Sequence, residues 1–280
     1  MRRIYPEGCF IMTDRIDLLK KVPVLLYHHI QPGGFNTVNP ILFERHISYL
    51  KEQGYTGVTF RQILFDSNLP DKPVVITFDD GYEAVYRFAL PILEKAGFKA
   101  VIFMLAGYVG EKNSWDLSLE PRSIRHLNEQ ELTDLSLKGW EIASHTMSHR
   151  PLIALSKEEL KREVEKSCER LEDILKSKPI GFAFPFGCHN AEVRKAVEQA
   201  GYLYACGALK RHQLPESEFQ LVRIPVYRFD SVFAIRRKLL YPEIPRLEYY
   251  KLKMVSYLSR LTPVYQTLFK RSRLKDKGNE

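Results

Sequence analysis

Cysteine is scarce in this chain and follows no regular spacing. Only four cysteines occur among 280 residues, and no two of them form a CxxC pair. This pattern excludes a small domain stapled by several disulfides. It favours free thiols in a reducing compartment and leaves one disulfide open.

Long apolar runs are also lacking. No segment approaches the roughly 18 consecutive apolar residues that a transmembrane helix needs. The first residues, Met1 to Arg3, resemble the start of a secretory signal, but Pro, Glu and Gly follow where such a signal has its apolar stretch. We therefore expect no membrane-spanning helix, no signal peptide and a cytoplasmic location.

Net charge is absent from most of the chain. Residues 236–280 hold 12 of the 42 Lys+Arg and 4 of the 34 Asp+Glu, which accounts for the whole formal charge of +8. The other 235 residues hold 30 of each sign. Because this balanced part also lacks a nucleic-acid-binding motif, we expect no nucleic-acid partner.

The basic end of the chain is amphipathic. Apolar residues recur at steps of three and four from Met254 to Phe269, as on one helix face, and Thr262-Pro263 divides them between two predicted helices. Residues 246–277 could make peripheral contact with an anionic membrane, at its inner face. They could equally pack against the preceding domain, and the sequence leaves both open.

The rest of the chain is typical of one globular α/β domain. Internal repeats and low-complexity tracts are absent, and 45% of the residues are hydrophobic, which excludes a disordered or collagen-like chain. Strand and helix patterns alternate over residues 22–240, between an N-terminal extension (1–21) and a C-terminal helical tail (241–280). About seven such units favour a single barrel over two separate domains. The predicted strands are Val22–Ile30, Pro73–Phe78, Ala100–Leu105, Trp140–Ser144, Ile180–Phe184, Leu203–Cys206 and Leu221–Tyr227; the predicted helices are Pro40–Gln53, Ala84–Ala96, Glu129–Leu137, Lys157–Lys176 and Ala191–Ala200.

Two adjacent carboxylates end one of the predicted strands. Asp79 and Asp80 follow the apolar run Val74–Ile76, at the barrel end where such folds keep their active sites. Because neighbouring strand residues point to opposite sides, two different jobs suit the pair, for example one metal ligand and one base. The alternative is a solvated Asp-Asp-Gly turn.

Two histidines follow another predicted strand. His145 and His149 are four residues apart, a spacing that lets both side chains of a helical turn bind one metal ion. With Asp80 they would form a three-ligand set that leaves positions open for water and substrate. A single HxxxH pattern is a weak signal on its own.

These residues carry a resemblance to a known family. TFDDGY (77–82), SHTMSH (144–149) and FPFG (184–187), together with VPVLLYH (22–28) and RIPV (223–226), resemble the polysaccharide deacetylase family. This family is also called the NodB-homology domain or carbohydrate esterase family 4. The opening and closing motifs are similar to those of its poly-N-acetylglucosamine deacetylase branch.

The resemblance implies a distorted (β/α) barrel and metal-dependent removal of acetyl groups from N-acetylated amino sugars. Asp80, His145 and His149 match the metal ligands, Asp79 matches the general base, and His28 matches the general acid. The cofactor implied is one divalent ion, zinc first, with nickel, cobalt and iron as alternatives. An N-acetylated saccharide or a saccharide precursor is the implied substrate.

Further residues are assigned more loosely. Phe186 would donate its backbone N–H to the oxyanion, with Pro185 beside it. Tyr82 and Trp115 could stack on a sugar ring, whereas single aromatics of this kind more often belong to the core. His46 and His126 are expected at ordinary surface positions, and His189 could contact substrate.

The chain departs from the family pattern at two places. Ala183 stands where many members have an Arg that orients the catalytic Asp, so support for Asp79 must come from elsewhere. The C-terminal Leu-x-His motif is missing too, since no His follows His212. The acid is then His28 or His29, and the match to Tyr-His favours His28.

Two other functions remain open at this point. The same fold could hydrolyse a different amide, such as a cyclic ureide, or could serve as a catalytically inactive saccharide-binding domain. Retention of all five catalytic positions argues against the inactive domain, because a binding module needs no metal triad beside a base.

Overall fold

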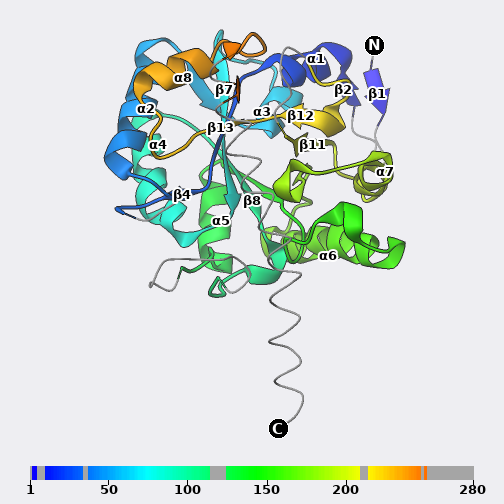
Figure 1. Ribbon diagram of the computed structural model, residues 1–280. Helices are drawn as coiled ribbons and strands as arrows, with labels where there is room; N and C mark the ends of the chain where they lie inside the picture. The colour runs from blue at the N-terminus through cyan, green and yellow to red at the C-terminus, as the bar shows by residue number, and fades with distance from the viewer. Residues whose placement is uncertain are drawn as a thin grey trace.

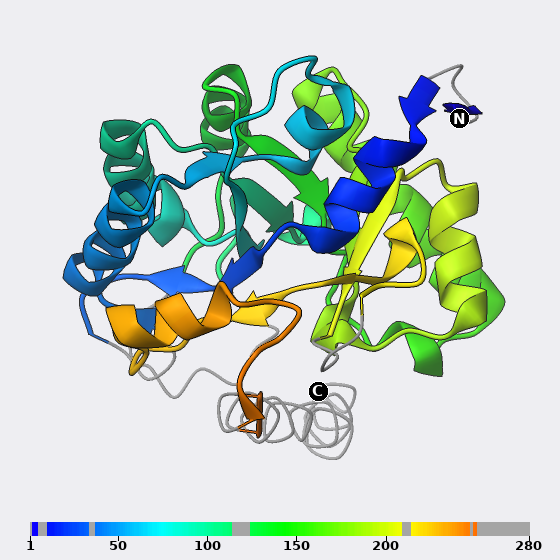
Figure 2. The same ribbon diagram turned by 90° about the horizontal axis from the view of Figure 1, so that it is seen from above.

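The computed structural model describes residues 2–4, 10–33, 37–113, 124–208, 214–246 and 249–250. Within them a parallel sheet is nearly closed into a barrel, with helices around its outside (Figures 1 and 2), as the sequence predicts. The strand order is β12-β11-β10-β9-β8-β7-β3-β13, and β6 pairs with β7. These strands are β3 (Val24–Tyr27), β6 (Thr56–Val58), β7 (Pro73–Asp80), β8 (Val101–Met104), β9 (Glu141–Ser144), β10 (Gly181–Ala183), β11 (Tyr204–Gly207), β12 (Leu221–Val222) and β13 (Ile224–Pro225).

One short segment brings the two edges of the sheet together. β12 pairs with β11 at one end of the strand order, and β13 pairs with β3 at the other end. Only Arg223 separates β12 from β13 in the chain. The seam of the barrel therefore falls at Arg223.

Helices connect successive strands and lie around the barrel, and α8 follows the last strand (Figure 2). Two small strand pairs lie outside the main sheet, β1 (Arg2–Ile4) with β2 (Phe10–Met12) and β4 (His29–Ile30) with β5 (Thr37–Val38). The helices are α1 (Thr13–Lys21), α2 (Pro40–Glu52), α3 (Phe60–Phe65), a π-helical turn (Val85–Ala89) leading into α4 (Leu90–Ala96), α5 (Glu129–Leu137), α6 (Lys157–Leu175), α7 (Ala191–Gln199) and α8 (Val232–Lys238).

Alternation along the strands divides the core into an inner and an outer layer. Val75 and Phe103 belong to a cluster with residues from strands all around the barrel, which places them in its interior. Ile76 and Phe78 belong instead to the cluster that includes α2 and α4. Asp79 has the same parity as Val75, so its side chain points into the barrel.

Sequence signals at the helix ends are confirmed. Ser156 caps α6 in a capping box with Glu159, as predicted. Gly97 ends α4 with a left-handed φ of 77°, and Gly201 follows α7 with a φ of 88°. These residues stop each helix close to its predicted boundary.

Several short elements escape the sequence analysis. The sequence pattern does not predict α1, α3, α8 or β6, which have nine, six, seven and three residues and so offer few periods of a repeating pattern. The buried core also extends beyond residues 22–240, since Ile16 and Leu19 join its inner layer and Tyr241 and Ile244 its outer layer.

Three further expectations concern thiols, membrane spans and the tail. Cys168, Cys188 and Cys206 are free thiols. No helix in the described part of the chain has the length and apolarity needed to cross a membrane. Nearly all of residues 246–277, and Trp115, lie outside the described residues.

Candidate metal centre

The two aspartates at the end of β7 face the same neighbour. His145 Nε2 lies 3.8 Å from Asp79 Oδ2 and 3.6 Å from Asp80 Oδ1. The expectation that they point to opposite sides is wrong, because Asp80 has a left-handed φ of 68° and leaves the alternation of the strand. Gly81 follows with a φ of 67°, and a Cβ there would lie 2.1 Å from the sulfur of Met104.

The histidine motif forms a loop after β9 instead of a helical turn. Thr146 and His149 have left-handed φ values of 74° and 57°, which corrects the predicted helical spacing. His145 Nδ1 donates to the carbonyl of Ala183 at 2.8 Å, so its Nε2 carries the lone pair that faces the aspartates. His149 Nε2 lies 3.7 Å from Asp80 Oδ1.

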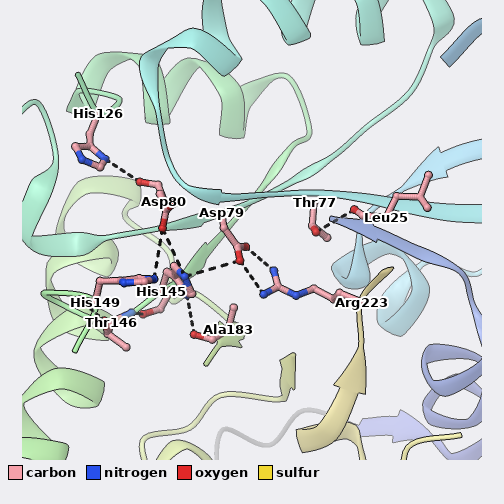
Figure 3. A network of polar contacts seen from close by, with 11 residues as sticks. Leu25, Thr77, Asp79, Asp80, His126, His145, Thr146, His149, Ala183 and Arg223 are labelled. Atoms are coloured by element: carbon pink, nitrogen blue, oxygen red, sulfur yellow. Dashed lines mark hydrogen bonds and ion pairs between the residues drawn. The ribbon is translucent and has the colours of Figure 1, made fainter. Parts of the chain in front are cut away.

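These side chains form a donor set that fits one divalent metal ion. One ligand atom from each of Asp80, His145 and His149 lies within 4.8 Å of the other two (Figure 3). Ligand atoms about 2.0–2.2 Å from one ion are separated by about 3–4 Å, and Asp80 Oδ1 lies at such a distance from both imidazole Nε2 atoms. Burial lowers the pKa of His145 to about 4, and burial followed by the charge of His145 lowers the pKa of His149 well below its ordinary range. Both imidazoles are therefore neutral near pH 7, the form that binds metal.

The carboxylate of Asp79, which lies near His145, is also paired with an arginine. Arg223 donates from both terminal nitrogens to the two carboxylate oxygens, with Nη2 2.8 Å from Oδ2 (Figure 3). The guanidinium carbon also lies 4.9 Å from the ring centroid of Phe103. Burial alone raises the pKa of Asp79, but the charge of Arg223, followed by that of His145, outweighs it and holds the pKa at about 2. The carboxylate is thus ionised throughout the neutral range.

Arg223 supplies the support that Ala183 cannot give. Arg223 begins the RIPV motif of the family resemblance, but the sequence pattern around it does not indicate a role beside Asp79. The available signal was topological: the last strand of a closed parallel barrel lies beside the first, and a residue there can point toward Asp79. Ala183 contributes its backbone instead, as the acceptor for His145.

The two histidines after β3 occupy different environments. His28 is half-buried, and its charge is among those that lower the pKa of Asp79, after Arg223 and His145. His29 is buried and stacks on Tyr82 with 3.6 Å between ring centroids. Burial, followed by the charges of His28 and His126, lowers the pKa of His29 to about 3.

Tyr82 does not fit its expected contact with a sugar. Its side chain is 1% exposed and stacks on His126 as well as on His29, so its ring is not available to a substrate. Phe186, by contrast, is only partly buried and has a left-handed φ of 58°. Its ring packs against His149 with 4.7 Å between centroids.

His46 and His126 are buried, which corrects the prediction of surface positions. His46 contacts the hydroxyl of Tyr27 at 3.2 Å and the carbonyl of Asp230 at 2.8 Å. His126 Nδ1 lies 2.8 Å from the carbonyl of Asp80, directly behind the candidate metal ligand. A single histidine in a sequence carries no signal of either contact.

Helix α6 organises the histidine loop from outside the barrel. The buried carboxylate of Glu163 accepts hydrogen bonds from the backbone N–H groups of Met147 and Ser148, at 3.0 and 2.9 Å, and from the Ser148 hydroxyl. The Ser144 hydroxyl donates to that of Ser167, also on α6, at 2.8 Å. These bonds fix the loop between His145 and His149, whose side chains both have to face Asp80 to share one metal ion.

A parallel barrel with one carboxylate and two neutral imidazoles at the carboxyl ends of its strands is an arrangement typical of metal-dependent hydrolases. The sequence model described as polysaccharide deacetylase matches residues 66–205, which is 140 of the 280 residues. The chain belongs to the polysaccharide deacetylase family.

Individual relatives agree with this assignment. The chain is 32% identical over 186 residues to YxkH of Bacillus subtilis (strain 168), a predicted polysaccharide deacetylase, in an alignment spanning 65% of this chain and 62% of that protein, less than two thirds of its length. It is 27% identical over 201 residues to the poly-β-1,6-N-acetyl-D-glucosamine N-deacetylase of Staphylococcus aureus (strain MRSA252), covering 67% of each. The structure of the Streptococcus pyogenes deacetylase PplD superposes with a TM-score of 0.66 at 23% identity, covering 78% of this chain and 98% of that one, a likeness of fold.

Proposed function

We propose that the protein hydrolyses the acetamide of an N-acetylated amino sugar, in a saccharide or a saccharide precursor, releasing acetate and a free amine. The observation that carries the proposal is the buried, ionised Asp79, paired with Arg223 and beside the Asp80, His145 and His149 set. A saccharide-binding domain without activity would need no ionised base next to a metal-ligand set. The named S. aureus relative acts on poly-β-1,6-N-acetyl-D-glucosamine, which makes that sugar polymer the first substrate to test.

Asp80, His145 and His149 would hold the metal ion. Zinc is the first choice, because catalytic zinc sites commonly combine three such ligands with an open position; nickel, cobalt and iron are alternatives. When bound, a divalent ion polarises the amide oxygen and acidifies a water molecule. The His145 hydrogen bond to the Ala183 carbonyl and the His149 N–H bond to the Thr146 hydroxyl support the positions of these two histidines.

Proton transfer is assigned to Asp79 and His28. As the C–O bond to the acetyl carbon forms, Asp79 takes the proton of the attacking water. As the C–N bond breaks, His28 gives a proton to the amine nitrogen. Two features support His28 over His29: its charge influences the pKa values of Asp79, His145 and His149, whereas His29 is buried against Tyr82.

The loop after β10 is assigned to the oxyanion. We infer that the backbone N–H of Phe186 donates to the carbonyl oxygen as it gains negative charge. The left-handed backbone of Phe186 and the contact of its ring with His149 keep this loop at the ligand set. Pro185, buried beside it, restricts the loop further.

Metal dependence provides the direct test. Acetate release would be measured with a panel of N-acetylated glycans and of nucleotide-linked and lipid-linked precursors. We expect release from at least one of them, loss of release after dialysis against a chelator, and recovery on adding zinc or cobalt. Release that persists in metal-free protein would contradict the metal-dependent mechanism. Hydrolysis of a cyclic ureide, without hydrolysis of any N-acetylated sugar, would contradict the proposed substrate class.

We further propose that residues 246–277 attach the protein to the inner face of the membrane. The support is the sequence pattern of apolar steps and basic charge. Co-sedimentation with vesicles containing about 30% anionic lipid is expected for the full chain, and is expected to fall when Lys270, Arg271, Arg273 and Lys275 are replaced by Glu, because each basic residue near the surface contributes about 1 kcal/mol. Equal sedimentation of both proteins would contradict this attachment.

A further inference from the structure

The backbone that carries the candidate ligand Asp80 is unusual. Asp80 and Gly81 are consecutive residues with left-handed φ values of 68° and 67°. A glycine adopts this conformation readily, whereas an Asp needs support from its surroundings. The position of the Asp80 carboxylate depends directly on this turn, because the turn removes it from the alternation of β7.

A single segment, residues 124–127, supports both residues of the turn; we call it the strap. The N–H of Leu127 donates to the Gly81 carbonyl at 2.8 Å, and His126 Nδ1 lies 2.8 Å from the Asp80 carbonyl. The Glu83 N–H donates to the Arg125 carbonyl at 2.9 Å, and Tyr82 and His126 form an antiparallel bridge. The carbonyl oxygens of the two left-handed residues, Asp80 and Gly81, thus accept hydrogen bonds from two consecutive residues of the strap, His126 and Leu127.

The strap is itself fixed on its other side. The N–H of His126 donates to the Glu111 carbonyl at 2.9 Å, and the Gly110 N–H donates to the Leu127 carbonyl at 2.8 Å. Residues 110–112, the strap and residues 81–83 therefore lie side by side as a small hydrogen-bonded ribbon. The strap is thus hydrogen-bonded on both sides, to residues 110–112 and to residues 81–83.

The imidazole of His126 is placed for one hydrogen bond. A carbonyl oxygen only accepts, so Nδ1 carries the proton and donates it to Asp80. The side chain is 1% exposed, and its Nε2 has no hydrogen-bond partner among the described residues. Stacking on Tyr82, with 4.9 Å between centroids and 24° between planes, fixes the direction of the ring. Burying Nε2 without a partner costs free energy. The hydrogen bond that Nδ1 makes to Asp80 gives a reason for a histidine at this buried position.

The backbone carbonyl of Asp80 contacts His126, while its carboxylate faces the other two candidate ligands, His145 and His149. Figure 3 shows His126 on the carbonyl side of Asp80, with the Asp80 carboxylate directed the other way, toward His145 and His149. We propose that His126 is a positioning residue, whose Nδ1–H holds the Asp80 peptide in its left-handed conformation and so places the carboxylate for metal binding. This inference rests on the proposed function only in taking Asp80, His145 and His149 as the metal ligands.

Two substitutions separate the hydrogen bond from the ring. His126→Phe keeps an aromatic ring to stack on Tyr82 but removes the donor. His126→Asn keeps an N–H close to the position of Nδ1 but removes the ring. His46→Phe is the matched control, because it also removes the hydrogen bonds of a buried histidine, at a site without contact to Asp80.

The measurement is the affinity of the metal-free full chain for Zn²⁺ in competition with a chromophoric chelator, together with the visible spectrum of the Co²⁺ form. Mutating a residue that hydrogen-bonds to a metal ligand typically lowers the affinity for the metal by about 10–100-fold. We expect His126→Phe to lose at least about tenfold in affinity and to alter the Co²⁺ spectrum, His126→Asn to stay within about threefold of the parent, and His46→Phe to match the parent.

The outcomes distinguish this inference from the proposed function. Parent-like affinity of His126→Phe, or equal losses for the Phe and Asn variants, would overturn the role of the hydrogen bond. Failure of the parent protein to bind Zn²⁺ at all would overturn the ligand set and the proposed metal-dependent function with it. Melting temperatures of the metal-free proteins, compared with His46→Phe, identify losses that come from unfolding alone.

Discussion

Replacing Asp79 with Asn is expected to lower the rate of acetate release by about 10²–10⁴-fold, the range that general acid–base catalysis supplies. Asn has the same shape but cannot take a proton from water. Because Asp79 is not one of the three proposed ligands, zinc content of the purified variant should match that of the parent. Asp80→Asn is the contrasting variant, since it should lose zinc and activity together.

Asp79→Asn also leaves Arg223 buried without a charged partner, so a loss of stability must be distinguished from a loss of catalysis. Asp230→Asn provides the matched control: Asp230 pairs with Lys238 at 2.8 Å and both side chains are fully buried. It should lower the melting temperature in a similar way without removing activity. A residual rate above about one tenth of the parent in Asp79→Asn would contradict the role of Asp79 as base.

The sheet and the donor set are the parts that the sequence predicts well. All seven predicted strand regions contribute to the barrel, because a run of apolar residues encodes a strand buried on both faces. Parallel strands also bring their carboxyl ends to one edge of the sheet. The motif that ends β7 and the motif that follows β9 therefore meet, which is why the sequence alone groups Asp80, His145 and His149.

Local backbone geometry limits the prediction of the same site. The alternation rule places Asp79 correctly and fails at Asp80, and a helical spacing for the two histidines fails because Thr146 and His149 are left-handed. Residues other than glycine rarely adopt this conformation, so no local pattern predicts it. Tertiary contacts from Glu163 and His126 hold these turns in place.

Supporting residues are separated from their targets by long stretches of chain. Arg223 is 144 positions from Asp79, and His126 is 46 positions from Asp80. Periodicity reports which face of an element is buried but not which distant side chain shares a hydrogen bond with it. For this reason the motifs indicate that Ala183 cannot support Asp79 but do not indicate that Arg223 does.

The role of Arg223 leads to the second large expected effect, a change in the pH dependence of activity in Arg223→Met. Burial raises the pKa of Asp79, and in the native protein the charge of Arg223 outweighs it. Without that charge the pKa of Asp79 rises, and the protonated carboxyl cannot act as a base. The acidic limb of the rate profile should therefore move up by at least about one pH unit, with an intermediate shift in Arg223→Lys, which keeps the charge but loses the paired geometry.

The contribution of Asp79 to stability should change with pH in opposite directions in the native protein and in Arg223→Met. In the native protein the depressed pKa of Asp79 contributes stability that is present above its ordinary value of 3.8 and is lost as the pH falls through about 2. In Arg223→Met the raised pKa favours the protonated folded state, so this group stabilises the fold as the pH falls. The variant should lose about 3–5 kcal/mol at neutral pH, the usual effect of leaving one buried charge unpaired.

Activity lost in Arg223→Met could come from protonation of Asp79 or from a less stable fold, and Lys238→Met separates these two explanations. It also leaves a buried carboxylate, Asp230, without its cation. Rate profiles from about pH 5 to 9 and denaturant unfolding would be recorded for both variants and the parent. Lys238→Met should lose stability and keep the parental acidic limb. If the limb moves equally in both variants, or in neither, Arg223 acts on the fold alone, and Asp79 does not depend on it to stay ionised.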